Sequence, residues 1–310
     1  MAGKIAPEFK TGDLPRANLE EIMKRLSTVT AVFSLVLLFS FVTHAQSETV
    51  SVHGAGTIAY KTYGAGDRTL ILIHGYSFSK EVWDKAAPLI DDDWTVYAFD
   101  IRGFGDSDKP EEGYDYPSMV NDLAAFMDAL SIDRAVIGGH SLGGTFIQDF
   151  AVRYPNRVDG LILANAQARN LPPMGMSESF LKRIDAWGDP ETNRAIFEKA
   201  TPRYFKDPLP AAELTTLIAM NEKSATPALK QAFSHLLTAD PIDATSWPAL
   251  DMPILIVAST HDLVPFKVPV ALLDALPTAS LSVIARSGHT PMWEKPNEFA
   301  ESVNDFLDDL

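Results

Sequence analysis

A serine lies among four glycines near the middle of the chain, in the segment Gly138-Gly139-His140-Ser141-Leu142-Gly143-Gly144. Each glycine costs a strand or helix about 0.5–1 kcal/mol relative to alanine, so such a cluster needs a steric reason. An apolar run typical of a buried strand precedes the segment, and a helical pattern follows it. Gly-x-Ser-x-Gly between a strand and a helix is typical of a strained turn that exposes a nucleophile at a helix N-terminus. We therefore predict that Ser141 is a nucleophile.

A serine hydroxyl needs a general base, and the base needs a carboxylate that orients it. On the fold in which this turn occurs, the order along the chain is serine, acid, histidine, each on a loop after a strand. Asp262 follows the apolar run 254–258, and His289 follows the run 281–284. We predict that Asp262 is the acid and that His289 is the base.

The other histidines offer one rival base. His261 directly precedes Asp262, which favours a loop role for it, whereas His140 and His74 are expected to be structural. No pair of histidines has the spacing of metal ligands, and the chain has no cysteine, so neither a metal nor an organic cofactor is predicted.

The oxyanion of such a reaction needs two N–H donors. We predict that they are the backbone N–H groups of Tyr76, after the glycine that ends the run 70–75, and of Leu142, after the serine. The segment after the next predicted strand, Asp100-Ile101-Arg102-Gly103, is interpreted as a loop clamp held by an Asp100–Arg102 pair.

Short apolar runs alternate with helical patterns along most of the chain, which predicts an α/β fold with a mostly parallel sheet flanked by helices. The predicted strands are Thr57–Tyr63, Thr69–His74, Thr95–Asp100, Arg134–Gly139, Val158–Ala164, Pro253–Ser259 and Ser280–Ala285. The predicted helices between them are Lys80–Ile90, Ser118–Leu130, Leu142–Arg153, Pro269–Leu276 and Pro296–Leu310.

The alternation stops between residues 168 and 247, where only helical patterns occur. Asp189-Pro190 and Thr226-Pro227 each predict a helix start, with a capping residue before proline. We interpret 168–247 as a helical cap inserted into a core of residues 46–167 and 248–310. Phe180, Trp187 and Met220 are predicted to line the substrate pocket.

The N-terminal residues read as a targeting segment. Met23-Lys24-Arg25, the apolar run 29–42 and Thr43-His44-Ala45 have the pattern of a signal peptide over residues 23–45. Residues 1–22 would then be a translated leader or an added extension. The alternative is a membrane anchor, but the run is shorter than the roughly 20 residues that a span needs. We expect a periplasmic or secreted protein.

The net charge of the 310-residue chain is −15, which disfavours nucleic acid and anionic membrane surfaces as partners after signal cleavage. A small molecule is the expected partner. Nothing in the pattern predicts the oligomeric state.

Three motifs, Arg102-Gly103-Phe104-Gly105, Gly113-Tyr114-Asp115-Tyr116 and Gly288-His289 with Pro291 and Glu294, resemble the α/β-hydrolase superfamily. The likeness is to the branch of serine carboxylesterases, lactonases and cofactor-free haloperoxidases. This resemblance implies the fold, the cap and an acyl-enzyme mechanism. It also implies that Asn165, where some relatives have their acid, leaves that role to Asp262.

The expected activity is hydrolysis of a small to medium, uncharged ester or lactone. One alternative keeps the triad and uses hydrogen peroxide as acyl acceptor, as a perhydrolase or haloperoxidase does. Hydrolysis of carbon–carbon bonds is a further alternative, and a ligand-binding receptor on a hydrolase scaffold is the alternative without catalysis.

Overall fold

The computed structural model describes residues 47–54, 56–171, 182, 185–243 and 250–310. The expected signal peptide and leader, and the predicted pocket residue Phe180, lie outside these ranges. Within them, no helix is both long enough and apolar enough to cross a membrane.

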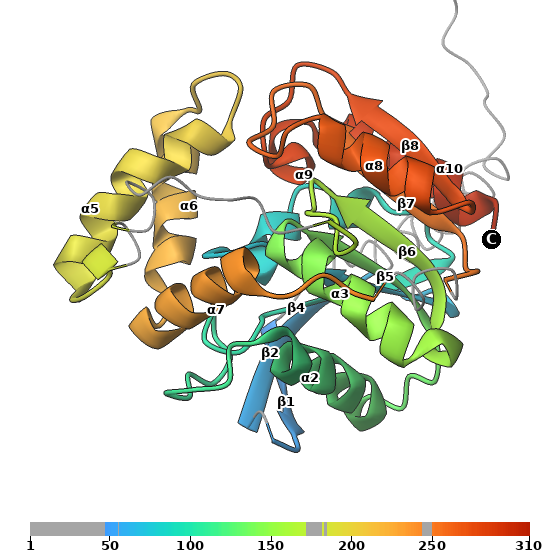
Figure 1. Ribbon diagram of the computed structural model, residues 1–310, viewed down its shortest axis with the longest axis horizontal. Coiled ribbons are helices and arrows are strands. Elements are labelled where there is room, and N and C mark those ends of the chain that lie inside the picture. Colours follow the sequence, from blue (N-terminus) through green and yellow to red (C-terminus); the bar gives the residue numbers. More distant parts are fainter. Residues whose placement is uncertain (1–46, 55, 172–181, 183–184, 244–249) are drawn as a thin grey trace, which may run out of the picture. The chain divides into compact units, whose positions relative to one another are not determined.

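Eight strands form one sheet in the order β1-β2-β4-β3-β5-β6-β7-β8 (Figure 1). The strands are β1 (Ser47–Val52), β2 (Gly56–Tyr63), β3 (Arg68–Ile73), β4 (Trp94–Phe99), β5 (Ala135–His140), β6 (Val158–Ala164), β7 (Ile254–Ser259) and β8 (Ala279–Ile284). β1 and β2 pair antiparallel with their neighbours, and all other pairs are parallel. The predicted α/β fold with a mostly parallel sheet is confirmed.

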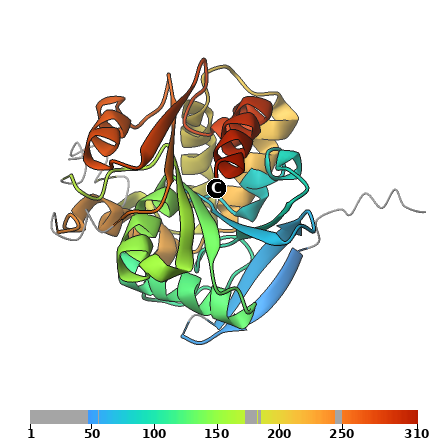
Figure 2. The same ribbon diagram turned by 90° about the vertical axis from the view of Figure 1, so that its right-hand side faces the viewer.

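Helices cover both faces of the sheet, and Figure 2 shows α2, α3 and α8 on one side of the strands and α10 on the other. The helices that pack on the sheet are α2 (Tyr116–Ala129), α3 (Leu142–Arg153), α8 (Lys267–Ala275) and α10 (Pro296–Asp308), and the short α9 (Pro291–Glu294) contacts α10. Successive residues of β3 alternate between the two core clusters, with Ile71 and Ile73 on the α3 face and Leu70 and Leu72 on the α10 face. A strand buried on both faces therefore reads as a continuous apolar run.

Two elements differ from the predicted ones. β1 was not predicted, because it is an edge strand with mostly exposed, polar residues and carries almost no apolar signal. The predicted helix over Lys80–Ile90 is instead two short 3₁₀ turns, η1 (Lys80–Trp83) and η2 (Ala87–Leu89). Pro88 lies in η2 and cannot donate a backbone hydrogen bond, and the N–H of Lys80 donates to Asp100.

Between β6 and β7 the regular elements that the structure describes are all helical. They are α5 (Pro190–Ala200), η4 (Thr201–Tyr204), α6 (Ala211–Glu222) and α7 (Thr226–Thr238). A further 3₁₀ turn, η3 (Pro155–Arg157), precedes β6. Asp189 caps α5 as its sequence indicates, by accepting bonds from two N–H groups of the first turn. Thr226 is no cap: it is the first residue of α7, and its hydroxyl donates to the carbonyl of Gly188. We refer to α5, η4, α6 and α7 as the cap helices.

Candidate active site

Ser141 occupies the turn between β5 and α3 with φ 50° and ψ −113°, a strained conformation for a residue with a side chain. The glycines around it are explained by close approach. A Cβ on Gly139 would lie 2.5 Å from the backbone of Gly143, and one on Gly143 would lie 2.6 Å from the carbonyl oxygens of Ile73 and His74. The turn therefore packs directly against the end of β3, which only glycine permits.

Asp262 and His289 come together although 27 residues separate them. They follow the neighbouring strands β7 and β8, and the His289 Nδ1 lies 2.5 Å from the Asp262 Oδ1. Both side chains are buried, with 6% of the Asp262 side chain and 9% of the His289 side chain exposed. This pairing leaves Nε2 of His289 free of the carboxylate.

One backbone carbonyl and two side chains hold the backbone of His289 by hydrogen bonds. Its N–H donates to the carbonyl of Tyr204 on η4, at 2.6 Å. Its carbonyl accepts from Nε2 of His140, at 2.7 Å, and from the amide of Asn165, at 3.0 Å. Asn165 thus lies at the end of β6, where the sequence places it, and its side chain supports the loop that carries His289.

The loop after β3 lies beside the serine, since a Cβ on Gly75 would be 3.1 Å from the Cβ of Ser141. Within the part of the chain that is described, neither the N–H of Tyr76 nor that of Leu142 donates to a loop carbonyl or a side chain. The hydroxyl of Tyr76 donates to the carbonyl of Leu229 on α7, at 2.7 Å, so a cap helix anchors this loop.

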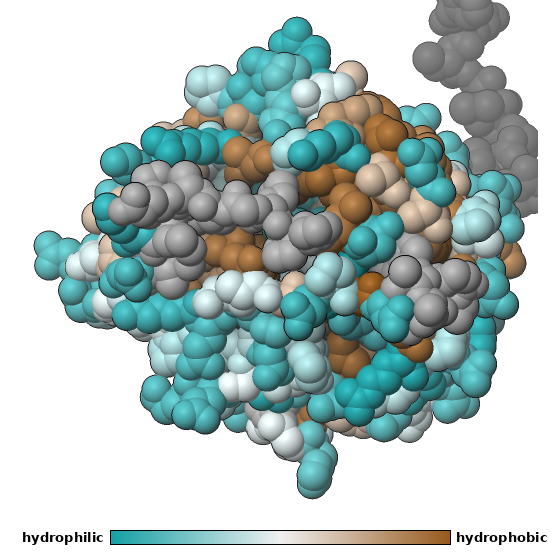
Figure 3. All heavy atoms as spheres, viewed as in Figure 1, coloured by the Kyte–Doolittle hydropathy of each residue, from teal (hydrophilic) through white to brown (hydrophobic). Residues whose placement is uncertain are grey.

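Ser141 and His289 line one cavity of about 360 Å³ between the sheet edge and the cap helices. Its other lining residues are mainly apolar or aromatic, and they are Tyr76, Phe78, His140, Gln167, Ala200, Arg203, Tyr204, Phe233, Leu236, Leu263 and Val264. Figure 3 shows apolar residues gathered between the cap helices and α8 on the face drawn there, with a mostly hydrophilic periphery. The arrangement can hold an apolar group next to a serine and a histidine.

Of the predicted pocket residues, the two that the structure describes, Trp187 and Met220, do not form this wall. Trp187 is buried against Phe197, with ring centroids 5.0 Å apart, and Met220 belongs to the core cluster on the α10 face. Neither lines the cavity, and Phe233 and Leu236 of α7 do so instead. A helical pattern shows that a residue is apolar, but not whether its side chain turns to the core or to a pocket.

The predicted Asp100–Arg102 pair is also wrong. Arg102 pairs with Asp122 on α2, whereas Asp100 pairs with Lys80 at 2.8 Å, and both partners of this second pair are fully buried. Burial by itself would lower the pKa of Lys80, but Asp100, Asp106 and Glu81 outweigh it and raise the pKa above its ordinary value. These ions fasten the loop after β4 to the loop after β3.

Two polar residues connect the cap to the site: sequence reasoning missed Asn221, and it named Glu294 only as part of a motif, without a role. Asn221 of α6 is fully buried; its amide donates to the carbonyl of Ser77 at 2.6 Å, and its oxygen accepts from Thr201. Glu294 of α9 accepts from the N–H groups of Gly288 and Lys206, at 2.6 and 2.9 Å. A polar residue at the end of the apolar run 217–220 was the only signal for Asn221.

In the part of the chain that is described, no three histidine or acidic side chains form a group that could hold a metal ion. His74 accepts the N–H of Ile101 at its Nε2 and has its Nδ1 at 2.8 Å from the carbonyl of Gly75. His261 is exposed and contacts the hydroxyl of Thr260.

The family model of the alpha/beta hydrolase fold matches residues 68–296. The chain belongs to this family. Of its relatives, a 2-hydroxy-6-oxo-2,4-heptadienoate hydrolase of Pseudomonas putida is 29% identical over 79% of this chain and 90% of its own. Relatives that are named as hydrolases are enzymes, and those named for a substrate, such as this hydrolase, act on small molecules.

Solved structures agree with this assignment. A membrane phospholipase A described as a bacterial virulence factor superposes with a TM-score of 0.73 and 27% identity, over 95% of this chain and 99% of its own. The enol-lactonase of Burkholderia xenovorans LB400 superposes with a TM-score of 0.74 and 22% identity, over 84% and 100%, which shows the shared fold.

The buried histidines of this hydrolase predict how its stability depends on pH. Burial, with a smaller effect of His289, lowers the pKa of His140 well below 6.5, and burial also lowers the pKa of His74. Below pH about 6.5 the unfolded chain therefore binds protons that the folded chain does not bind, so the free energy of unfolding falls as the pH falls. Each such histidine contributes at most about 1.4 kcal/mol per pH unit.

Urea unfolding between pH 8 and 5 measures this slope. We expect His140→Asn to flatten it, because asparagine does not titrate, whereas His53→Asn at an exposed position leaves it unchanged. Equal slopes for the wild type and His140→Asn would contradict a neutral, buried His140.

Proposed function

We propose that this chain is a serine hydrolase that cleaves a small to medium carboxylic ester or lactone through an acyl-enzyme. The observation that carries the proposal is that His289, hydrogen-bonded to Asp262, lines the same cavity as Ser141 on its strained turn. A serine, a histidine and an orienting carboxylate in this order are what nucleophilic acyl transfer requires.

In the proposed mechanism, Ser141 Oγ attacks the substrate carbonyl while Nε2 of His289 takes the hydroxyl proton. Asp262 holds the imidazole through Nδ1 and stabilises its positive charge. The N–H groups of Tyr76 and Leu142 donate to the oxyanion. His289 then protonates the leaving oxygen. Water, activated by the same histidine, attacks the acyl-serine and releases the carboxylic acid and Ser141.

We also propose export. The proposal rests on the signal-peptide pattern of residues 23–45; the chain contains no cysteine, so no cysteine-borne lipid anchor is expected after cleavage. N-terminal sequencing of the protein from the periplasm and medium tests it. A mature N-terminus near Gln46 supports export, and an intact Met1 or Met23 in the cytoplasmic fraction contradicts it.

An activity screen separates this function from its alternatives. We would assay p-nitrophenyl esters of two to eight carbons, lactones, a vinylogous 1,5-diketone for carbon–carbon cleavage, and peracid formation from acetate and hydrogen peroxide, each beside Ser141→Ala. Ester or lactone turnover that needs Ser141 supports the proposal. Peracid formation without ester turnover favours the perhydrolase, and no turnover at all favours a receptor.

The wall at Phe233 predicts chain-length selectivity. Phe233→Ala removes apolar contact with a long acyl group but leaves the serine, the histidine and the N–H donors in place. We expect KM for octanoate esters to rise about tenfold, equivalent to about 1.4 kcal/mol, with acetate esters nearly unchanged.

Steady-state kinetics from acetate to octanoate measure this effect. Phe197→Ala is the matched control, because Phe197 is a buried cap residue that does not line the cavity. The ring of Phe233 also packs 4.7 Å from that of Tyr76. A fall in kcat at every chain length would therefore assign Phe233 to support of the oxyanion loop instead of to the acyl pocket.

A further inference from the structure

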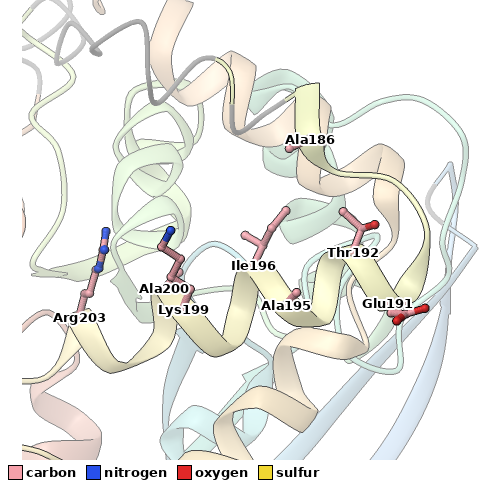
Figure 4. Close-up of a pocket in the computed structure, with 8 residues that line it drawn as sticks. All are labelled: Ala186, Glu191, Thr192, Ala195, Ile196, Lys199, Ala200 and Arg203. Atoms are coloured by element: carbon pink, nitrogen blue, oxygen red, sulfur yellow. The ribbon is translucent and has the colours of Figure 1, made fainter.

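Two cations near the cavity, Lys199 and Arg203, have no acidic partner among the residues that the structure describes. Lys199 is in the last turn of α5 and Arg203 is one helical turn further, on η4, and Figure 4 shows both side chains extending from the same side of the helix. Within the described ranges, no carboxylate forms an ion pair with either. By contrast, Arg194 of the same helix pairs with Glu198 and Glu222. In a chain of net charge −15, two unpaired neighbouring cations need an explanation.

Arg203 lies at a junction between two hollows. Together with Ala200 it lines the cavity of Ser141, and the same two residues line an adjoining cleft with Lys199, Ile196 and Thr192 (Figure 4). Ala200 and Arg203 are thus the residues that border both hollows, and a molecule that extended from the serine into this cleft would lie beside them.

The position of Arg203 relative to the catalytic groups is held by its neighbour. Tyr204 accepts the N–H of His289 at 2.6 Å, and its ring centroid lies 5.9 Å from that of His289. Thr201, two residues before Arg203, donates to the buried Asn221. η4 is thus fastened at both ends, which reduces the entropy lost when its side chains bind a ligand.

The walls of the cavity and of the adjoining cleft differ in polarity. Phe78, Phe233 and Leu236 present apolar surface near Ser141, whereas Arg203 and Lys199 present positive charge at one edge. A guanidinium donates two parallel hydrogen bonds to a carboxylate, and a nearby ammonium adds charge. Among the described residues of the cleft, Glu191 is the single carboxylate, and it lies two turns of α5 before Lys199.

We propose that Arg203, assisted by Lys199, selects esters or lactones that carry a carboxylate group away from the scissile carbonyl. This inference rests on the proposed function, and it replaces the expected uncharged substrate by an anionic one. The reaction stays a hydrolysis: water adds across the ester bond, the carboxylate of the substrate is unchanged, and a second carboxylic acid is released. The net charge of the chain predicts the opposite, namely that anionic esters react more slowly.

The test compares esters that differ in one charge. Mono-p-nitrophenyl adipate is compared with p-nitrophenyl hexanoate, and 4-carboxyphenyl butanoate with phenyl butanoate, so that the carboxylate lies on either side of the ester. We expect the wild type to prefer the anionic member of at least one pair about tenfold in kcat/KM, as for one hydrogen bond to a charged group. Added NaCl should reduce this preference.

The variants assign the preference to Arg203. Arg203→Gln should raise KM for the preferred anion about tenfold and change the neutral ester less than about twofold, while Arg203→Lys keeps part of the preference. Arg194→Gln is the matched control, since it removes the same charge from α5, the helix directly before η4, outside the cavity. Anionic preference that survives Arg203→Gln, or that is absent from the wild type, overturns the inference while leaving the proposed function intact.

A binding measurement covers the case in which no ester is hydrolysed, which would count against the proposed function. Calorimetry on Ser141→Ala compares monomethyl adipate, which carries one carboxylate, with uncharged methyl hexanoate, with and without Arg203→Gln. Tighter binding of the anionic ester that requires Arg203 supports the anion site on its own. Equal binding of the two esters overturns it.

Discussion

Ser141→Ala and His289→Ala are each expected to lower kcat for the best ester by about 10⁴- to 10⁶-fold, and the double variant by no more than either alone. The reason is that the serine is a weak nucleophile without its base, so the loss of one member removes the function of the other. Asp262→Ala should lower kcat about 10- to 100-fold less than these variants do. Tyr204, His140 and Asn165 still hold the backbone of His289, so its imidazole keeps part of its orientation.

Single-turnover and steady-state kinetics on the folded variants measure these losses, with circular dichroism as the check on folding. His261→Ala is the matched control, because His261 is the neighbouring histidine and is exposed, and we expect less than about a twofold change. Loss of activity in His261→Ala, with His289→Ala retaining it, would show that the base has been assigned to the wrong histidine.

Lys80→Met is expected to lower the free energy of unfolding by about 3–5 kcal/mol, since it leaves a buried carboxylate without its cation. Lys80 and Asp100 are both fully buried, and the Lys80 Nζ also lies 2.7 Å from the Asp106 carboxylate. Burial by itself would raise the pKa of Asp106, but Lys80 and Lys223 outweigh burial and lower the pKa to about 2. Asp106 keeps Lys223, the residue after α6, as its partner when Lys80 is lost, so the expected cost comes from Asp100.

Urea unfolding of three variants tests the buried pair. Lys85→Met removes the same charge from a partly exposed ion pair with Glu213, and it should cost less than about 1 kcal/mol. Lys80→Met with Asp100→Asn should recover part of the stability, because the amide keeps an acceptor for the N–H of Lys80 without a buried charge. Equal losses for Lys80→Met and Lys85→Met would show that the buried pair contributes no more than a surface pair.

The largest elements and the centre of the candidate site could be predicted from local sequence. β5, Ser141 and α3 follow from an apolar run, a glycine cluster and a helical pattern that are contiguous in the chain. Asp262 and His289 were found because parallel strands end at the same edge of a sheet, so residues that follow β7 and β8 must be neighbours. Here the spacing along the chain carries the spatial information.

Contacts between distant segments could not be predicted in this way. Asp100 had Arg102 two residues away, yet it pairs with Lys80, because burial of the loop after β4 against the loop after β3 selects the partner. β1 lacked an apolar signal because its partner β2 supplies the hydrogen bonds and its own side chains remain in solvent.

By itself the sequence determined the strands of the sheet other than β1, the turn that presents Ser141 and the two loops that meet at His289, because each depends on a pattern within one segment or on the order of the strands. Only the tertiary structure decided which residues of the cap helices face the cavity: Phe233 and Arg203 face it, whereas Trp187 and Met220 are buried elsewhere. The physical reason is that the apolar residues of a helix can pack against the core or line a cavity, and the helical pattern is the same in both cases. The rotation and position of α5, α6 and α7 are set by contacts such as Asn221 with Ser77 and Tyr76 with Leu229, which join residues more than 140 positions apart.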